Sequence, residues 1–322
     1  MLSDLGTTRL RTGLLAPATE ALRRSVEIRE SEWAATPEDV GLGQGLLKVQ
    51  TALGSVLVQQ GVVAEGGAML VRAIETHDRV AKGSPSGEAW SLERARLMLQ
   101  AAFLLRGLGR LGEAAKARAL AAPALEPSAQ AALGQGKALS NAGRIDEATA
   151  VYLQGLELNH LLWGSNPDDA VAGLRMAALA TQLPSDLARV DRDAAAEQYG
   201  RKACGITETA WAVHPRSSEL GWEVYKAHLF LGVLFRDTNQ LKSAIEPFQR
   251  AERVAATLVA LAPTAPAPLA AQAQVLIELG RLQEAGSLIA AALRLSPEFP
   301  WAVMLKENLD VRTRSSRGGG VR

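Results

Sequence analysis

A six-residue phrase recurs seven times along this chain and limits what it can fold into more than any other feature. The copies are GLLAPA at 13–18, GVVAEG at 61–66, GRLGEA at 109–114, GRIDEA at 143–148, DRDAAA at 191–196, NQLKSA at 239–244 and GRLQEA at 280–285. Successive copies begin 48, 48, 34, 48, 48 and 41 residues apart. Repetition on this scale predicts stacked helical repeats, which bury their apolar surface between neighbours and need no central core.

The residues around the phrase also repeat. Seven residues before six of the copies stands a small residue: Gly6, Gly54, Ala102, Gly136, Gly232 and Ala273. Nine residues after the start of five copies stands a larger one: Leu22, Leu70, Tyr152, Phe248 and Ile289, whereas Arg118 and Gly200 depart from the pattern. Two antiparallel helices can approach closely only where side chains are small, and a larger side chain fills the space beyond. Each copy therefore predicts a turn between two packed helices.

This pattern resembles the tetratricopeptide repeat, with its small residue in the first helix, Gly-containing turn and small, aromatic and small residues in the second. The stretches 129–160 and 266–297 match best, the latter ending on Pro297. Long units spaced by 48 residues are similar to the repeats that follow the kinase domain in some bacterial signalling kinases of eukaryotic type, and to those of kinesin light chains. The resemblance implies an all-α, right-handed superhelical solenoid of about seven antiparallel helix pairs.

We expect a single solenoid over residues 1–312, followed by a flexible basic tail at 313–322. Its units are expected at about 1–33, 40–82, 88–124, 128–160, 166–213, 217–262 and 266–297, with a C-terminal capping helix at 300–312. Asn166, followed by Pro167, is the expected N-cap of the fifth pair. The insertion at 182–190 makes the fifth repeat degenerate.

Composition excludes several classes of function. The 35 Lys and Arg residues balance 34 Asp and Glu residues, so a net charge of +1 gives no general attraction to nucleic acid or an anionic membrane. The single cysteine, Cys204, rules out an intrachain disulfide framework and is interpreted as a small buried residue. No signal-peptide core or membrane-length apolar run is present, so we expect a soluble, cytoplasmic protein.

No catalytic constellation stands out. Gly107, Gly109 and Gly112 spell G-x-G-x-x-G, but they follow a helical segment rather than a strand, so the dinucleotide interpretation fails. The four histidines, His77, His160, His214 and His228, share no helix face at metal spacing. We therefore expect no enzyme activity, no cofactor and no metal.

The resemblance implies that the first helix of each pair lines a concave, ligand-binding surface. Carried onto this sequence, the binding residues are Arg96, Phe103, Arg106, Lys137, Asn141, Lys226 and Arg236. Basic residues dominate there, which favours an acidic extended or helical peptide with an apolar anchor.

The expected function is that of a non-enzymatic scaffold or adaptor that binds a peptide or partner protein in this groove. One alternative is a regulatory segment of a larger signalling enzyme, such as a Ser/Thr kinase. Another is an RNA-binding helical repeat, which the irregular spacing and neutral charge disfavour. The sequence leaves open the oligomeric state and whether the groove or the convex face binds.

Overall fold

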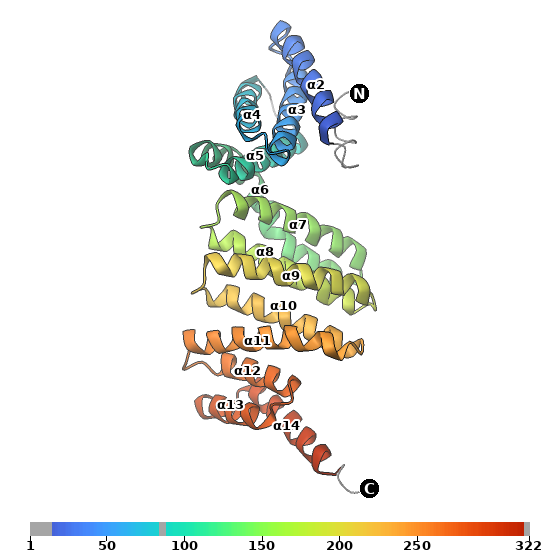
Figure 1. The fold of residues 1–322 in the computed structure, drawn as a ribbon, viewed down its shortest axis with the longest axis vertical. Coiled ribbons are helices and arrows are strands. Elements are labelled where there is room, and N and C mark those ends of the chain that lie inside the picture. The colour runs from blue at the N-terminus through green and yellow to red at the C-terminus, as the bar shows by residue number, and fades with distance from the viewer. Residues whose placement is uncertain (1–14, 84–87, 319–322) are drawn as a thin grey trace. The chain divides into compact units, whose positions relative to one another are not determined.

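A computed structural model describes residues 15–83 and 88–318, and throughout these ranges the chain forms α-helices joined by short turns (Figure 1). The expected first helix of the first pair lies outside the described residues. The helices are α2 (Leu15–Ala35), α3 (Val40–Gln59), α4 (Val63–Gly83), α5 (Glu88–Gly107), α6 (Leu111–Asn141), α7 (Ile145–Ser165), α8 (Ala170–Ala188), α9 (Asp193–Val213), α10 (Ser218–Asp237), α11 (Leu241–Leu261), α12 (Pro266–Glu278), α13 (Leu282–Leu295) and α14 (Pro300–Gly318). The prediction of an all-α helical repeat is confirmed for these residues.

Neighbouring helices pack in pairs at the small residues that the sequence singles out. In the pairs α3–α4 and α10–α11, Gly54 faces Leu70 and Gly232 faces Phe248. Gly136 of α6 faces the Tyr152 ring of α7 in the same way. A β-carbon at any of these glycines would overlap the facing side chain, so glycine sets how closely the helices approach.

The turns inside the described helix pairs share one geometry. Gly61, Gly109, Gly143 and Gly280 have φ angles between 74° and 79°, and Asp191 and Asn239 take the same place with φ angles of 57° and 60°. After each of these residues the next backbone N–H closes the preceding helix; for example, Arg144 donates to the Leu139 carbonyl at 2.9 Å. This bond and the left-handed residue together form the Schellman motif, which satisfies carbonyls at a helix end.

The chain forms two compact units. Unit 1 comprises Met1–Ala131 and Glu157–Pro167, and unit 2 comprises Ala132–Leu156 and Asp168–Arg322. Leu22, Leu53 and Leu57 lie in the core of unit 1.

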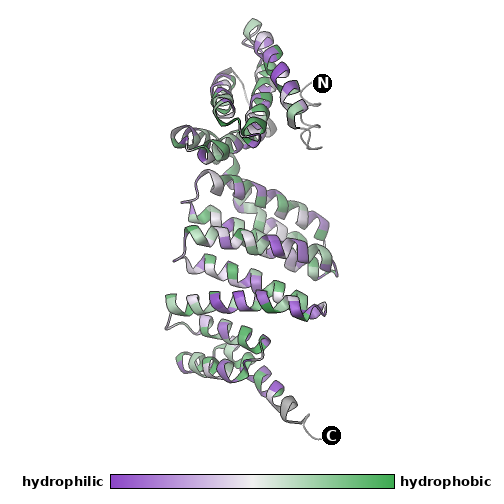
Figure 2. Ribbon diagram, viewed as in Figure 1, coloured by the Kyte–Doolittle hydropathy of each residue, from purple (hydrophilic) through white to green (hydrophobic). Residues whose placement is uncertain are grey.

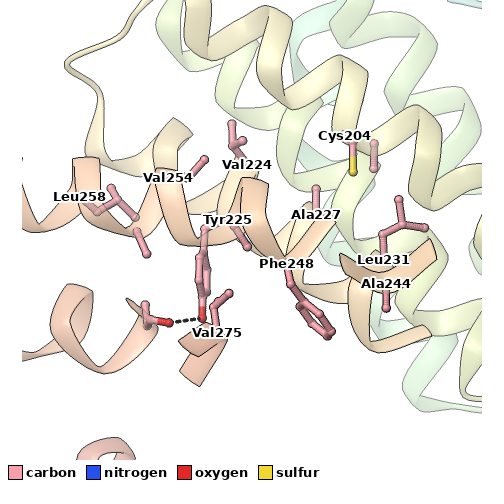
Figure 3. Close-up of a cluster of buried hydrophobic side chains, with 14 of the residues drawn as sticks. Cys204, Val224, Tyr225, Ala227, Leu231, Ala244, Phe248, Val254, Leu258 and Val275 are labelled. Carbon is pink, nitrogen blue, oxygen red and sulfur yellow. Dashed lines mark hydrogen bonds between the residues drawn. The ribbon is translucent and has the colours of Figure 1, made fainter. Parts of the chain in front are cut away.

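In unit 2, α8 to α11 lie side by side, and each carries both hydrophobic and hydrophilic residues (Figures 1 and 2). Its core includes Tyr225, Phe248 and Val275, and the Tyr225 hydroxyl donates to the Ala271 carbonyl at 3.1 Å (Figure 3).

The expected break between the third and fourth pairs, at 124–128, is absent. Instead, α6 runs without interruption from Leu111 to Asn141, with Pro123 and Pro127 inside it. Both prolines are exposed, whereas Ala122, Leu125 and Ala129 are buried. Packing of this buried side holds the helix together across two residues that each remove a backbone hydrogen bond.

Two helix ends also differ from the expectation. Asp169, not Asn166, is the N-cap of α8, because its carboxylate accepts from the Ala172 N–H at 3.0 Å. Residues 182–188 of the expected insertion continue α8 through Pro184. At the C-terminus, α14 extends to Gly318, so much of the expected tail is helical.

Candidate functional site

In unit 1, α7 contacts two of the predicted binding residues. Arg96 donates to Glu157 at 2.5 Å. The Phe103 ring lies 5.5 Å from the His160 ring and packs against Gly164. The side chain of Arg106 forms no ion pair with the described residues. One side of the Phe103 ring is thus already covered by α7, within the same unit.

In unit 2, the remaining four predicted residues lie on α6 and α10. Lys137 and Asn141 are exposed near the end of α6, and Lys137 forms no ion pair with the described residues. Lys226 pairs with Glu223 at 2.5 Å, within α10. Arg236 donates to Glu278 of α12 at 2.7 Å. The structure thus joins α10 to α12 through one of the predicted residues.

One stripe of α10 stays accessible along the length of the helix. We call it the α10 surface, and it consists of Trp222, Lys226, Leu229, Val233 and Arg236. Steps of four and three residues keep these side chains on one face of a helix with 3.6 residues per turn. Lys226 is exposed and the other four are half-buried; Trp222, Leu229 and Val233 also pack against the core of unit 2. The surface therefore combines an indole, two aliphatic side chains and two cations.

Aromatic side chains gather at the N-terminal end of the α10 surface. The Trp222 ring meets the Tyr225 ring edge-on, with centroids 5.5 Å apart. Trp301 of α14 lies 6.2 Å from Trp222. Indole rings at half-buried positions offer a large apolar area at small entropic cost, which favours binding of another protein surface.

Acidic residues from α10 and α12 hold the cations of the α10 surface in place. Glu223 accepts from Thr181 of α8 at 2.7 Å, besides its pairing with Lys226. The Glu278 carboxylate accepts hydrogen bonds from both Arg236 and Arg312 of α14. Hydrogen bonds to Asp237 and Glu278 also hold the pKa of Arg236 above its ordinary value. These partners neutralise much of the positive charge expected from the sequence.

Glu157 and Glu223 come from positions outside the implied lining, so the sequence did not indicate them, whereas Glu278 holds a lining position that the resemblance implies. Trp222 was not among the predicted binding residues. The available signal was the four-and-three spacing that links Trp222 to Lys226, Leu229, Val233 and Arg236 on one helix.

No three His, Cys, Asp or Glu side chains in the described ranges are grouped so as to hold a metal ion. Burial raises the pKa of the Cys204 thiol to about 12, which keeps it protonated and unreactive. The buried Asp186 carboxylate is satisfied by three donors, from Tyr152, Gln182 and Arg189. Among the described helices, none is long and apolar enough to cross a membrane.

Comparisons with known proteins return only distant likenesses. No family model matches the chain, and no curated protein matches it. Among solved structures, YrrB, described as a TPR protein with an unusual peptide-binding site, shares 15% identity, covering 70% of this chain and 100% of that one, with a TM-score of 0.34. TTC0263, a thermophilic TPR protein of Thermus thermophilus, shares 17% identity over 82% of this chain and 97% of its own, with a TM-score of 0.33.

A tetratricopeptide repeat protein from Parabacteroides merdae shares 13% identity over 96% of this chain and 97% of its own, with a TM-score of 0.34. These likenesses are too distant to transfer a site or a ligand. The chain's own helix pairs, small contact residues and left-handed turn residues are those of a TPR-like repeat, as the sequence predicts.

Proposed function

We propose that this protein is a non-enzymatic interaction scaffold that binds a segment of a partner protein along the α10 surface. One observation carries the proposal. An accessible stripe of α10 combines an indole, two aliphatic side chains and two cations, and Trp301 extends it at one end.

The cations and the apolar side chains of the α10 surface are expected to contribute to different properties of binding. Lys226 and Arg236 already have acidic partners within the protein, so they act mainly on association rate and on the choice of partner. The half-buried indoles and aliphatic side chains supply most of the affinity. A helical or extended segment with an apolar anchor and acidic flanks fits this arrangement. Within unit 2, Lys137 and Asn141 stay candidates for contacts with a longer segment.

The test begins with a partner captured by the full chain from its own cell, then purified. We expect Val233→Gln to weaken the affinity by about tenfold or more at any salt concentration, because an amide replaces an apolar contact. Lys226→Gln should weaken it by about twofold to fivefold, at low ionic strength only.

Matched controls lie on α11, where Ile245→Gln and Lys242→Gln change an exposed aliphatic and an exposed lysine in the same way. Titration calorimetry on all four variants, with circular dichroism to confirm folding, gives the comparison. A partner that loses affinity only with the α11 variants would refute binding at the α10 surface.

A further inference from the structure

Two pockets, one in each unit, are built from equivalent residues. The Trp33 pocket of unit 1 has a volume of about 320 Å³ and lies between α2, α3 and α4. The Trp211 pocket of unit 2 has a volume of about 360 Å³ and lies between α9, α10 and α11. Corresponding lining residues are separated by the same number of positions, so that Glu30, Trp33 and Arg72 match Glu208, Trp211 and Arg250.

The shared part of the two pockets is structural. In each, the tryptophan packs against a glycine ten residues later, Gly43 or Gly221, near the start of the next helix. In each, an arginine of the following helix approaches the glutamate, at 4.0 Å for Arg72 and Glu30 and at 3.8 Å for Arg250 and Glu208. The repeat packing therefore explains why both pockets exist.

The two pockets differ at four matched lining positions, and two of the four differences change the charge. In the Trp33 pocket, the Arg79 guanidinium lies over the indole, 4.1 Å from the ring centroid. Thr257 stands at the matching place in the Trp211 pocket, so no arginine covers that ring from there. Where the Trp33 pocket has Glu75, the Trp211 pocket has Arg253. The Trp211 pocket is thus more open and more positive.

The charges in the Trp211 pocket are not all satisfied. Glu208 contacts His228 at 3.0 Å as well as Arg250, and Arg250 also pairs with Glu246 at 3.2 Å. Arg253 is exposed and forms no ion pair with any described residue; its guanidinium donates only to the Gln249 carbonyl, at 3.4 Å. One unpaired cation therefore stands beside an apolar floor.

That floor is formed by Trp211 together with Val224 and Val254, two valines that lie next to one another in Figure 3. A ligand that fits must place an apolar group on the floor and a negative charge at Arg253. Carboxylates form strong charge-assisted hydrogen bonds with a guanidinium, and apolar side chains pack well on an indole.

We propose that the Trp211 pocket binds a partner-protein segment in which an apolar side chain is adjacent to an Asp or Glu. The apolar side chain packs on Trp211, above the buried Val224, and the carboxylate pairs with Arg253. Val224 lies two residues from Trp222, roughly 200° around α10, so this site is separate from the α10 surface. The full chain can then engage two segments.

The experiment uses two probe peptides, acetyl-Leu-Glu-Leu-amide and acetyl-Leu-Gln-Leu-amide, and the full chain with ¹⁵N-labelled tryptophan. We expect the glutamate peptide to shift the Trp211 indole N–H resonance in a saturable way. The glutamine peptide should bind about fivefold or more weakly, because it lacks the charge that pairs with Arg253. The Trp33 resonance should not move, because Arg79 already lies over that ring.

Three variants test whether the peptides bind in the Trp211 pocket. Arg253→Gln should make the two peptides bind equally, and Thr257→Arg should abolish binding by covering the indole as Arg79 does. Lys226→Gln, on the α10 surface, should leave the peptide-induced shift of the Trp211 resonance unchanged. The proposal is overturned if Trp211 responds to neither peptide, if either pocket variant binds as the parent does, or if binding depends on Lys226. Dependence on Lys226 would overturn this proposal but would agree with the proposed function, in which a partner binds along the α10 surface.

Discussion

At the scale of single residues, glycine decides how closely paired helices approach. Two glycines two positions apart in α6 have opposite surroundings. A β-carbon at Gly136 would overlap the Tyr152 ring, whereas nothing lies within 4 Å of one at Gly134. The same substitution should therefore have opposite effects at the two sites.

We expect Gly136→Ala to lower the free energy of unfolding by about 1–3 kcal/mol, because the added methyl group overpacks the contact with Tyr152. Gly134→Ala should raise it by up to about 1 kcal/mol, because alanine favours an exposed helix more than glycine does. Urea denaturation of both variants measures the difference. Equal effects at both positions would contradict the packing of α6 on α7 at Gly136.

At the scale of elements, α6 is the helix that departs most from the repeat pattern. Pro123 and Pro127 lie inside it, each without the N–H that an interior residue donates. If α6 is continuous, these prolines weaken it. If residues 124–128 were a turn, proline would instead favour the turn.

We expect Pro123→Ala and Pro127→Ala each to raise the free energy of unfolding by about 1–3 kcal/mol, since alanine restores the backbone donor and removes a steric clash. Pro37→Ala is the control, because Pro37 lies in a turn closed by the Asp39 N–H and the Thr36 carbonyl, 3.0 Å apart. That change should lower stability by up to about 1 kcal/mol. Loss of stability in all three variants would indicate a turn at 124–128.

At the scale of the whole molecule, a buried histidine in each unit links stability to pH. Burial lowers the pKa of His77 in unit 1, although Asp78 opposes the shift. Burial also lowers the pKa of His228 in unit 2, against its hydrogen bond to Glu208. Below the unfolded pKa of about 6.5, the unfolded chain binds protons that the folded chain does not. Both histidines therefore reduce stability as pH falls below that value.

We expect the free energy of unfolding to fall between pH 7 and pH 5, and His228→Gln to reduce that fall. Glutamine is the suitable replacement, because Gln50 occupies the matching place in unit 1 and donates to Glu30 at 3.3 Å. Urea denaturation of the parent and the variant at both pH values gives the comparison. An equal fall in both proteins would show that His228 is not a source of the pH dependence.

The helix pairs, their turns and their closest contacts could be predicted from the amino-acid sequence. These features depend on short-range physics, because a left-handed turn residue such as Gly143 and a small residue seven positions earlier act within one helix pair. The recurring phrase therefore located turns that the structure confirms, including those where Asp191 and Asn239 replace glycine.

The contacts of each helix face, in contrast, depend on how the helices pack and could not be predicted from the sequence. Continuity of α6 depends on burial of one side of the helix, which overrides the local signal of two prolines. The pairing of Arg96 with Glu157 joins residues 61 positions apart, and that of Arg236 with Glu278 joins residues 42 apart. Charge counts along the sequence contain no information on such partners, because ion pairs form between whichever side chains the packed helices bring within reach. The surface that was predicted to be basic therefore carries charges of both signs, because α7 and α12 contribute acidic partners.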